Sequence, residues 1–186
     1  SFTREDLIRY TQTHYQPNRI TIGAAGAVDA ARVKTIVGTY FNDLPRGAEP
    51  TVIEATHECL VKTLEKDLEQ IQIVLGFPSV AVTHKDFPKV QVLSTILGGG
   101  MSSRLFQEIR ERLGLAYSVS SFVSGYKDTG ILGIYAGTTQ EHMDELLVAL
   151  RKVLRGLHDV SEDELLRAKN QFKAGLVMSR ESSGRI

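Results

Sequence analysis

Cysteine is almost absent from this sequence, with only Cys59 among 186 residues. A single thiol forms no internal disulfide and no thiolate metal cluster, and we expect Cys59 to be a buried small apolar residue. Net charge is absent as well, because 22 Lys and Arg balance 22 Asp and Glu. No basic field therefore exists to attract nucleic acid or an anionic membrane, and no apolar run approaches the roughly 18 residues that span a bilayer. These absences argue against nucleic acid as a partner, and they do not indicate in which cellular compartment the protein is found.

Metal-binding patterns are also missing. None of the histidines has a second His or a suitable Glu four residues away; they are His14, His57, His84, His142 and His158. That spacing is what places two ligands on one face of a helix. The sequence therefore predicts no metal site and no cofactor in this chain itself.

Glycine, in contrast, is concentrated in one stretch around which the chain is organised. Residues 98–100 are three glycines, and without Cβ atoms they let the backbone lie close to another chain. Residues 105–113 then carry apolar side chains at i, i+1, i+4 and i+8, which predicts a helix with one apolar face. Gly114 stands where a left-handed residue ends a helix, and residues 117–123 are typical of a strand.

Nucleotide binding is the first alternative for a glycine loop that precedes a helix. No Lys followed by Ser or Thr comes after these glycines, and their spacing is not that of a dinucleotide-binding fingerprint. Residues 90–97 also have a helical pattern, whereas both nucleotide motifs follow a strand. These features argue against a nucleotide ligand.

The beginning of the chain predicts a helix, a strand and a second helix. Thr3 resembles an N-cap with acidic residues in the turn after it. Residues 19–26 alternate as a strand of small residues, and Asp29 caps a helix whose apolar face ends at Phe41.

A break follows this first unit. Residues 44–50 hold two prolines and a glycine without periodicity, which is typical of a linker. We therefore divide the chain into a helix–strand–helix unit at 1–44, a linker at 45–55 and a second unit at 56–186.

The second unit predicts alternating hairpins and helices. Its expected elements are strands at 59–64 and 71–77, a helix at 86–97, the central helix and strand, a strand at 131–136, and helices at 141–157 and from a capping box at 161–164 onward. Two hairpins result, one from 59–64 with 71–77 and one across the turn at 125–130. Helices that bracket antiparallel hairpins in this order predict an α+β fold with one face of the sheet covered.

Arg110 and Tyr117 are the candidate functional residues. If the helix ends near Leu113 and the chain turns at Gly114, a guanidinium and a phenol converge on one site. Charged donors and a hydroxyl on a rigid ring could bind a peptide carbonyl or stabilise an oxyanion. The alternative is structural, because Arg near a helix C-terminus is favoured by the dipole and can pair with a neighbouring Glu.

The stretch GGGMSSRLFQEIRERLGLAYSV at 98–119 closely resembles the second-domain signature of the M16 zinc peptidases, the insulinase, pitrilysin and mitochondrial processing peptidase family. The segments TREDL at 3–7, HYQPNR at 14–19, residues 23–26 and YFNDLP at 40–45 resemble the end of the family's first domain and the linker after it. The resemblance implies the LuxS/M16 α+β fold. It also implies that Arg110 and Tyr117 hold substrate opposite the zinc, and that Gly98, Gly99 and Gly100 take part in substrate recognition.

One departure from the family is important. The inverted His-x-x-Glu-His zinc motif does not occur in these residues, so we expect a fragment, cut at both ends, that is inactive alone. The resemblance implies that zinc belongs to the parent enzyme or to a partner subunit, and that this chain is its substrate-binding portion acting on peptides or unfolded polypeptides. The alternative is a non-catalytic scaffold or partner subunit of the core-protein type.

Partners follow from the same resemblance. They are a peptide substrate and the zinc-bearing M16 domain, in the same chain or in a partner subunit. We also expect the strand at 19–26 to fill an open edge of the later sheet, within one chain or in a domain-swapped homodimer.

Overall fold

The computed structural model describes residues 2–44 and 53–181. Its residues form two compact units. The first contains the described residues up to Ile53 together with those from Met178 onward, and the second is Glu54–Val177.

The first unit consists of short helices with polar caps. They are α1 (Arg4–His14), the 3-10 turn η1 (Pro17–Arg19) and α2 (Ala30–Phe41). The Thr3 hydroxyl accepts a hydrogen bond from the Asp6 amide (3.2 Å) and the Asp6 carboxylate accepts one from the Thr3 amide (3.1 Å), which confirms the predicted cap. Asp29 accepts hydrogen bonds from the first amides of α2, also as predicted.

The strand predicted at residues 19–26 is not formed. η1 ends at Arg19, and the chain from Ile20 to α2 has no strand pairing. In the described residues the sheet of the second unit takes its strands from residues 71–138, so the prediction that 19–26 fills an edge of it within the chain is wrong. The domain-swapped form stays a prediction. The Gly and Ala residues of this segment offer little side-chain area for packing against a neighbouring strand. An alternating sequence pattern does not by itself provide that neighbouring strand.

The second unit is built on a three-stranded antiparallel sheet. Its strands are β1 (Ile71–Ser79), β2 (Ser118–Gly125) and β3 (Gly130–Thr138), in the order β1-β3-β2. The hairpin of β2 and β3 is confirmed, with Ser121 opposite Ile134. On the other side of β3, Val74 of β1 lies opposite Tyr135.

The first predicted hairpin is wrong, because residues 59–64 form no strand and β1 pairs with β3 instead. The side chains of this segment are exposed, Val61 at 96%. Cys59 is exposed too, which corrects its predicted burial. Because apolar residues favour a strand only where a neighbour covers one face, the local pattern could not decide the pairing.

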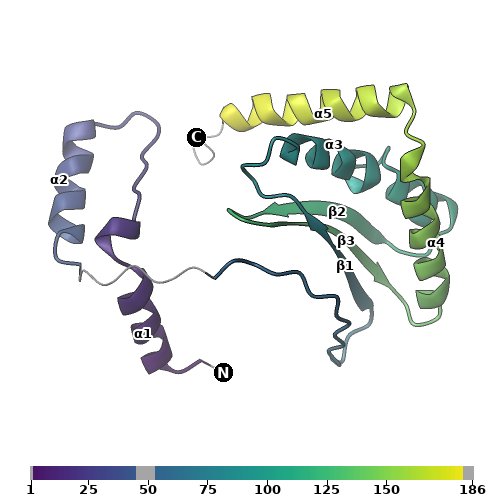
Figure 1. The fold of residues 1–186 in the computed structure, drawn as a ribbon, viewed down its shortest axis with the longest axis horizontal. Helices are drawn as coiled ribbons and strands as arrows, with labels where there is room; N and C mark the ends of the chain where they lie inside the picture. Colours follow the sequence, from purple (N-terminus) through teal and green to yellow (C-terminus); the bar gives the residue numbers. More distant parts are fainter. Residues whose placement is uncertain (1, 45–52, 182–186) are drawn as a thin grey trace. The chain divides into compact units, whose positions relative to one another are not determined.

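Helices cover one face of the sheet, as predicted (Figure 1). The helical elements that follow β1 are α3 (Phe87–Gly98), the π-helical η2 (Phe106–Arg112), α4 (Met143–Arg155), the 3-10 turn η3 (Gly156–His158) and α5 (Glu162–Arg180). Of these, α3 and η2 contact the strands, whereas α5 runs along the side of α3 that faces away from the sheet (Figure 1). The largest fully buried side chains are Leu97, Leu105, Ile109, Ile134, Leu146 and Leu150. Along β1 the inward residues are partly buried and alternate with exposed ones such as Val74, which shows that the opposite face is open. The fold is therefore α+β.

Candidate functional site

The site predicted from the sequence lies at the corner between η2 and β2. Leu105 and Ile109 are completely buried and fix this helix against the core. The helix is wider than an α-helix, because the Leu113 amide donates to the Glu108 carbonyl five residues earlier (3.1 Å). Gly114 then turns the chain with φ +64°, which confirms the predicted left-handed residue. π-helical turns are rare and occur frequently at functional sites.

The structure brings Arg110 and Tyr117 together at this corner. The guanidinium carbon of Arg110 lies over the Tyr117 ring, 4.6 Å from its centroid. It also lies over the Phe106 ring, 4.7 Å from that centroid. Both distances are within the roughly 6 Å over which a cation is attracted to an aromatic face. We refer to Phe106 and Tyr117 as the aromatic pair.

The polar atoms of this group remain available. The nearest carboxylate oxygen to the Arg110 Nε belongs to Glu111, at 3.9 Å, which is too long for a hydrogen bond. Within the described ranges neither the Arg110 guanidinium nor the Tyr117 hydroxyl has a hydrogen-bond partner, and Tyr117 is 74% exposed. A cation–π contact does not use up the hydrogen-bond donors of a guanidinium, which has five N–H groups. The corner therefore presents donors that, within the described residues, have no hydrogen-bond partner, although Arg110 forms a loose ion pair with Glu111.

The glycines at residues 98–100 are not explained by a left-handed backbone conformation, as Gly114 is. None has positive φ, since the part of the chain that the structure describes has that conformation only at Gly26 and Gly114. A Cβ on Gly98 would lie 2.4 Å from the Ser121 amide nitrogen, so this glycine lets α3 approach β2. Gly99 accepts a hydrogen bond from Gln171 on α5 (2.9 Å), and Gly100 accepts one from the Ser103 hydroxyl (2.6 Å).

No hydrogen bond or ring contact among the described residues joins these glycines to Arg110 or Tyr117. A Cβ on Gly100 would meet only the end of the Gln171 side chain, at 3.4 Å. Gly98 and Gly99 are thus explained by packing, and Gly100 is the one whose backbone conformation and surroundings leave room for a ligand-binding role.

Arg104 connects three elements. Its guanidinium donates to both oxygens of Glu164 on α5 (2.7 and 2.8 Å) and to the Gly156 carbonyl of η3 (2.5 Å). These hydrogen bonds lower the pKa of Glu164 to about 2, against the effect of desolvation, and the Ser161 amide and hydroxyl assist. Sequence reasoning did not find this contact, because the two residues are 60 positions apart. The one available signal was the Ser161–Glu164 capping box, which the structure confirms.

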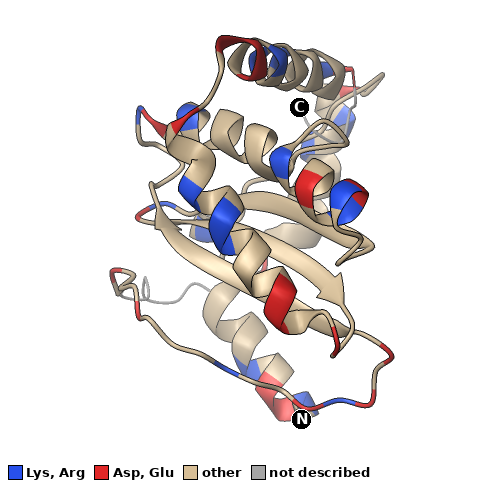
Figure 2. Cartoon of the chain, turned by 90° about the vertical axis from the view of Figure 1, so that its right-hand side faces the viewer, with Lys and Arg blue, Asp and Glu red and all other residues tan. Residues whose placement is uncertain are grey.

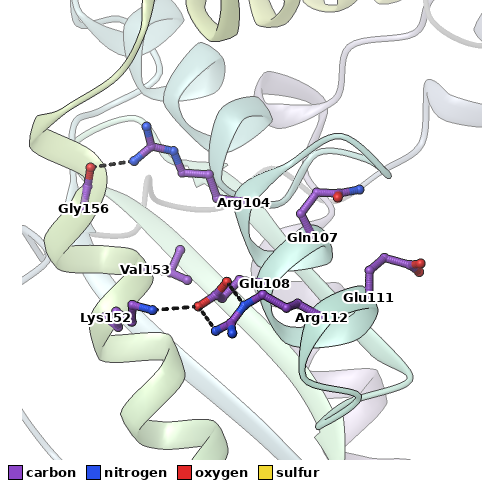
Figure 3. Close-up of a pocket in the computed structure, with 8 residues that line it drawn as sticks. All are labelled: Arg104, Gln107, Glu108, Glu111, Arg112, Lys152, Val153 and Gly156. Atoms are coloured by element: carbon purple, nitrogen blue, oxygen red, sulfur yellow. Dashed lines mark hydrogen bonds and ion pairs between the residues drawn. The ribbon is translucent and has the colours of Figure 1, made fainter.

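A pocket of about 640 Å³ lies between η2 and α4 (Figure 3). Its lining residues are Arg104, Gln107, Glu108, Glu111, Arg112, Lys152, Val153 and Gly156. Arg112 and Lys152 both donate to Glu108, and these hydrogen bonds, that of Arg112 first, lower its pKa to about 2. Arg110 and Tyr117 are not among the lining residues, so the pocket and the corner are separate features.

Charges along α4 follow the helix dipole. Asp144 and Glu145 lie in its first turn, and Lys152 and Arg155 in its last. Figure 2 shows the acidic residues at one end of this helix and the basic residues toward the other. This arrangement stabilises the helix. The three cations that line the pocket each form an ion pair, Arg104 with Glu164 and both Arg112 and Lys152 with Glu108.

Metal ligands are not clustered in the described part of the chain. Across residues 2–44 and 53–181, no group of three or more His, Cys, Asp or Glu side chains could hold an ion. In the same residues, no helix combines the length and the apolar character that crossing a membrane requires.

Comparison with known proteins identifies the family. Residues 1–172 match the model of the peptidase M16 inactive domain. The chain belongs to the peptidase M16 family. This agrees with the resemblance of residues 98–119 and with the α+β fold.

Individual relatives carry related names. This M16 chain is 36% identical over 183 residues to an uncharacterized zinc protease of Rickettsia felis, a match that covers 97% of the chain and 44% of the relative. It is 30% identical over 201 residues to a probable mitochondrial-processing peptidase subunit beta of Arabidopsis thaliana, covering 100% of the chain and 38% of the relative. The chain thus spans less than half the length of the curated relatives it matches.

Solved structures share the fold. The peptidase M16 inactive domain from Pseudomonas fluorescens matches with a TM-score of 0.77 at 24% identity, over 92% of this chain and 43% of that one. A chain of complex III2 from Candida albicans matches with a TM-score of 0.74 at 20% identity, over 99% of this chain and 46% of that one.

Proposed function

We propose that this chain is the substrate-binding, non-zinc-ligating portion of an M16-type zinc metallopeptidase that cleaves peptides or unfolded polypeptides. The observation that carries the proposal is the contact of Arg110 with Tyr117 at an exposed corner, where the polar atoms of both side chains have no hydrogen-bond partner among the described residues. Names of the relatives support the class of enzyme, since several are zinc proteases.

Arg110 and Tyr117 would bind and orient the substrate. A peptide carbonyl oxygen can accept hydrogen bonds from the guanidinium and from the Tyr117 hydroxyl. Both hydrogen bonds become stronger if negative charge develops on that oxygen. The side chains of the described residues offer no cluster for zinc, so we place the metal in another domain of the parent protein or in a partner subunit. Zinc bound there would supply a Lewis acid and an activated water.

A scaffold role is the second candidate. The structural match to a chain of complex III2 supports it, because this fold also occurs in a multisubunit assembly. A scaffold would need the surfaces of the chain but not the unengaged donors of Arg110 and Tyr117.

Kinetics of the longer protein that contains this chain distinguish the two candidates. We expect R110A and Y117F each to lower kcat/KM by about tenfold to a thousandfold, the effect of losing one positioned donor. The double variant should lose less than the sum of the two, because the residues act as one unit. R112A and Y126F are matched controls, since Arg112 pairs with Glu108 and Tyr126 is exposed in the turn after β2. Unchanged kinetics in R110A and Y117F, with unchanged stability, would favour the scaffold.

Separation of the chain from its zinc-bearing partner gives a further test. The chain lacks the His-x-x-Glu-His motif, so alone it should retain no stoichiometric zinc and hydrolyse no fluorogenic peptide. Metal analysis and a peptide assay on the purified chain check this. Stoichiometric zinc bound by its side chains would contradict the proposal that another domain or a partner subunit binds the metal.

A further inference from the structure

We propose that Phe106 is a positioning residue that holds the Arg110 guanidinium in place for substrate. This inference rests on the proposed function, in which Arg110 is a substrate-binding donor. The observation behind it is that the guanidinium carbon lies over the Phe106 ring at 4.7 Å, nearly the same distance as the 4.6 Å to the Tyr117 ring.

Phe106 is better fixed than Tyr117. It follows Leu105 and precedes Ile109, which are both completely buried, and its own side chain is half-buried. Tyr117, in contrast, is 74% exposed, and its hydroxyl has no partner among the described residues. Of the aromatic pair, Phe106 is therefore the ring that the core holds in place.

The spacing of Phe106 and Arg110 along the helix makes this contact possible, because side chains four residues apart are neighbours on a helix surface. Phe106 and Arg110 lie within the π-helical segment, four residues apart and about one turn from each other. Among the described residues no hydrogen bond engages the Arg110 guanidinium, so its contact with Phe106 leaves N–H donors for a ligand.

Phe106 also keeps Arg110 from a competing partner. Glu111 lies 3.9 Å from the Arg110 Nε, close enough to attract it but not to form a hydrogen bond. Without the Phe106 ring, we expect the guanidinium to close on this carboxylate, and its donors would then be occupied before substrate arrives.

A spectroscopic experiment on the full 186-residue chain tests the position of Arg110 without any enzymatic assay. In uniformly 15N-labelled protein, R110K identifies the Arg110 Nε–H signal. A guanidinium over two rings should give an upfield, ring-shifted signal in the unaltered chain, and F106L should move it downfield while F106W should keep it upfield. The matched control is F122L, because Phe122 lies against Gly133 on the sheet. A signal at the random-coil position in the unaltered chain would overturn the proposal even if F106L failed to fold.

Kinetics of the longer protein test the consequence for substrate. F106L should lower kcat/KM by about two- to tenfold, the equivalent of one partly exposed cation–π contact, and F106W should restore it. In an R110A background F106L should have no further effect, because Phe106 acts through Arg110. An equal loss in both backgrounds would overturn the positioning role. If R110A alone leaves kcat/KM unchanged, the proposed function fails, and the spectroscopic result still decides whether Phe106 holds the guanidinium.

Discussion

At the scale of single residues, substitution of Gly98 tests whether this glycine has a structural role in packing. An added Cβ would lie 2.4 Å from the Ser121 amide nitrogen and 2.8 Å from the Ser120 carbonyl carbon, and backbone atoms cannot yield as a flexible side chain does. We therefore expect G98A to lower the free energy of unfolding by about 2–3 kcal/mol or more. G175A on α5 is the control, since nothing lies within 4 Å of its added Cβ, and it should raise stability by about 0.5–1 kcal/mol. Urea denaturation of both variants checks this, and a fully stable G98A would contradict the packing reason.

Gly100 is the residue at which substrate recognition by the glycine loop can be tested. Because its added Cβ meets only the Gln171 amide at 3.4 Å, we expect G100A to keep the fold. A fall in kcat/KM of the longer protein by about threefold or more, with unchanged stability, would assign this position to substrate binding. Kinetics equal to those of the unaltered enzyme would contradict a role of Gly100 in substrate binding.

At the scale of elements, the pair of Arg104 and Glu164 connects the helical residues just before η2 to α5. Glu164 has a pKa of about 2 in the folded chain, below the ordinary value of 4.5, so the pair stabilises fully above about pH 4.5 and is lost as the pH falls toward 2. E164Q should cost about 1 kcal/mol at neutral pH and should make stability less dependent on pH between 4.5 and 2.

Urea denaturation at several pH values measures this effect. E162Q is the matched control in the same helical turn, because Glu162 makes no ion pair within the described residues. An equally steep loss of stability in E164Q and in the unaltered chain would show that this ion pair is not linked to folding.

Local contacts explain which elements could be predicted from the sequence. The caps of α1 and α2 and the capping box of α5 involve residues three or fewer positions apart, and the hairpin of β2 and β3 forms across a short turn. The meeting of Arg110 with Tyr117 was predictable because seven residues and one glycine turn separate them. Segments 19–26 and 59–64 have strand-like patterns, but a strand also needs a distant neighbour, which no local pattern specifies. For the same reason Arg104 and Glu164 could not be paired in advance.

Phe106 was predicted as part of an apolar helix face and not as a partner of Arg110. The apolar pattern places Phe106 on a helix face, but it does not indicate that the ring also meets the Arg110 guanidinium four residues later. Of the candidate site, the residue types were therefore predictable from the sequence, whereas the contact that orients them was not.

At the scale of the whole molecule, the two units differ in how much apolar surface they bury. Among residues 2–44 no apolar side chain is buried, and neither α1 nor α2 has a buried residue. The main core cluster is drawn from residues 73–157, all in the second unit. Since burial of apolar area is the main favourable term in folding, the second unit has its own source of stability.

Removal of residues 1–44 should consequently leave a protein that unfolds in one cooperative transition. We expect its dependence on urea to match the main transition of the full chain, because that slope scales with the area exposed by the same core. A peptide of residues 1–44 should show no cooperative transition, since two short helices without a buried face are marginal in water. Circular dichroism during urea titration measures both. If the shortened protein lost its transition, the first unit would be required for the core of the second, and the cluster at residues 73–157 would be insufficient to fold alone.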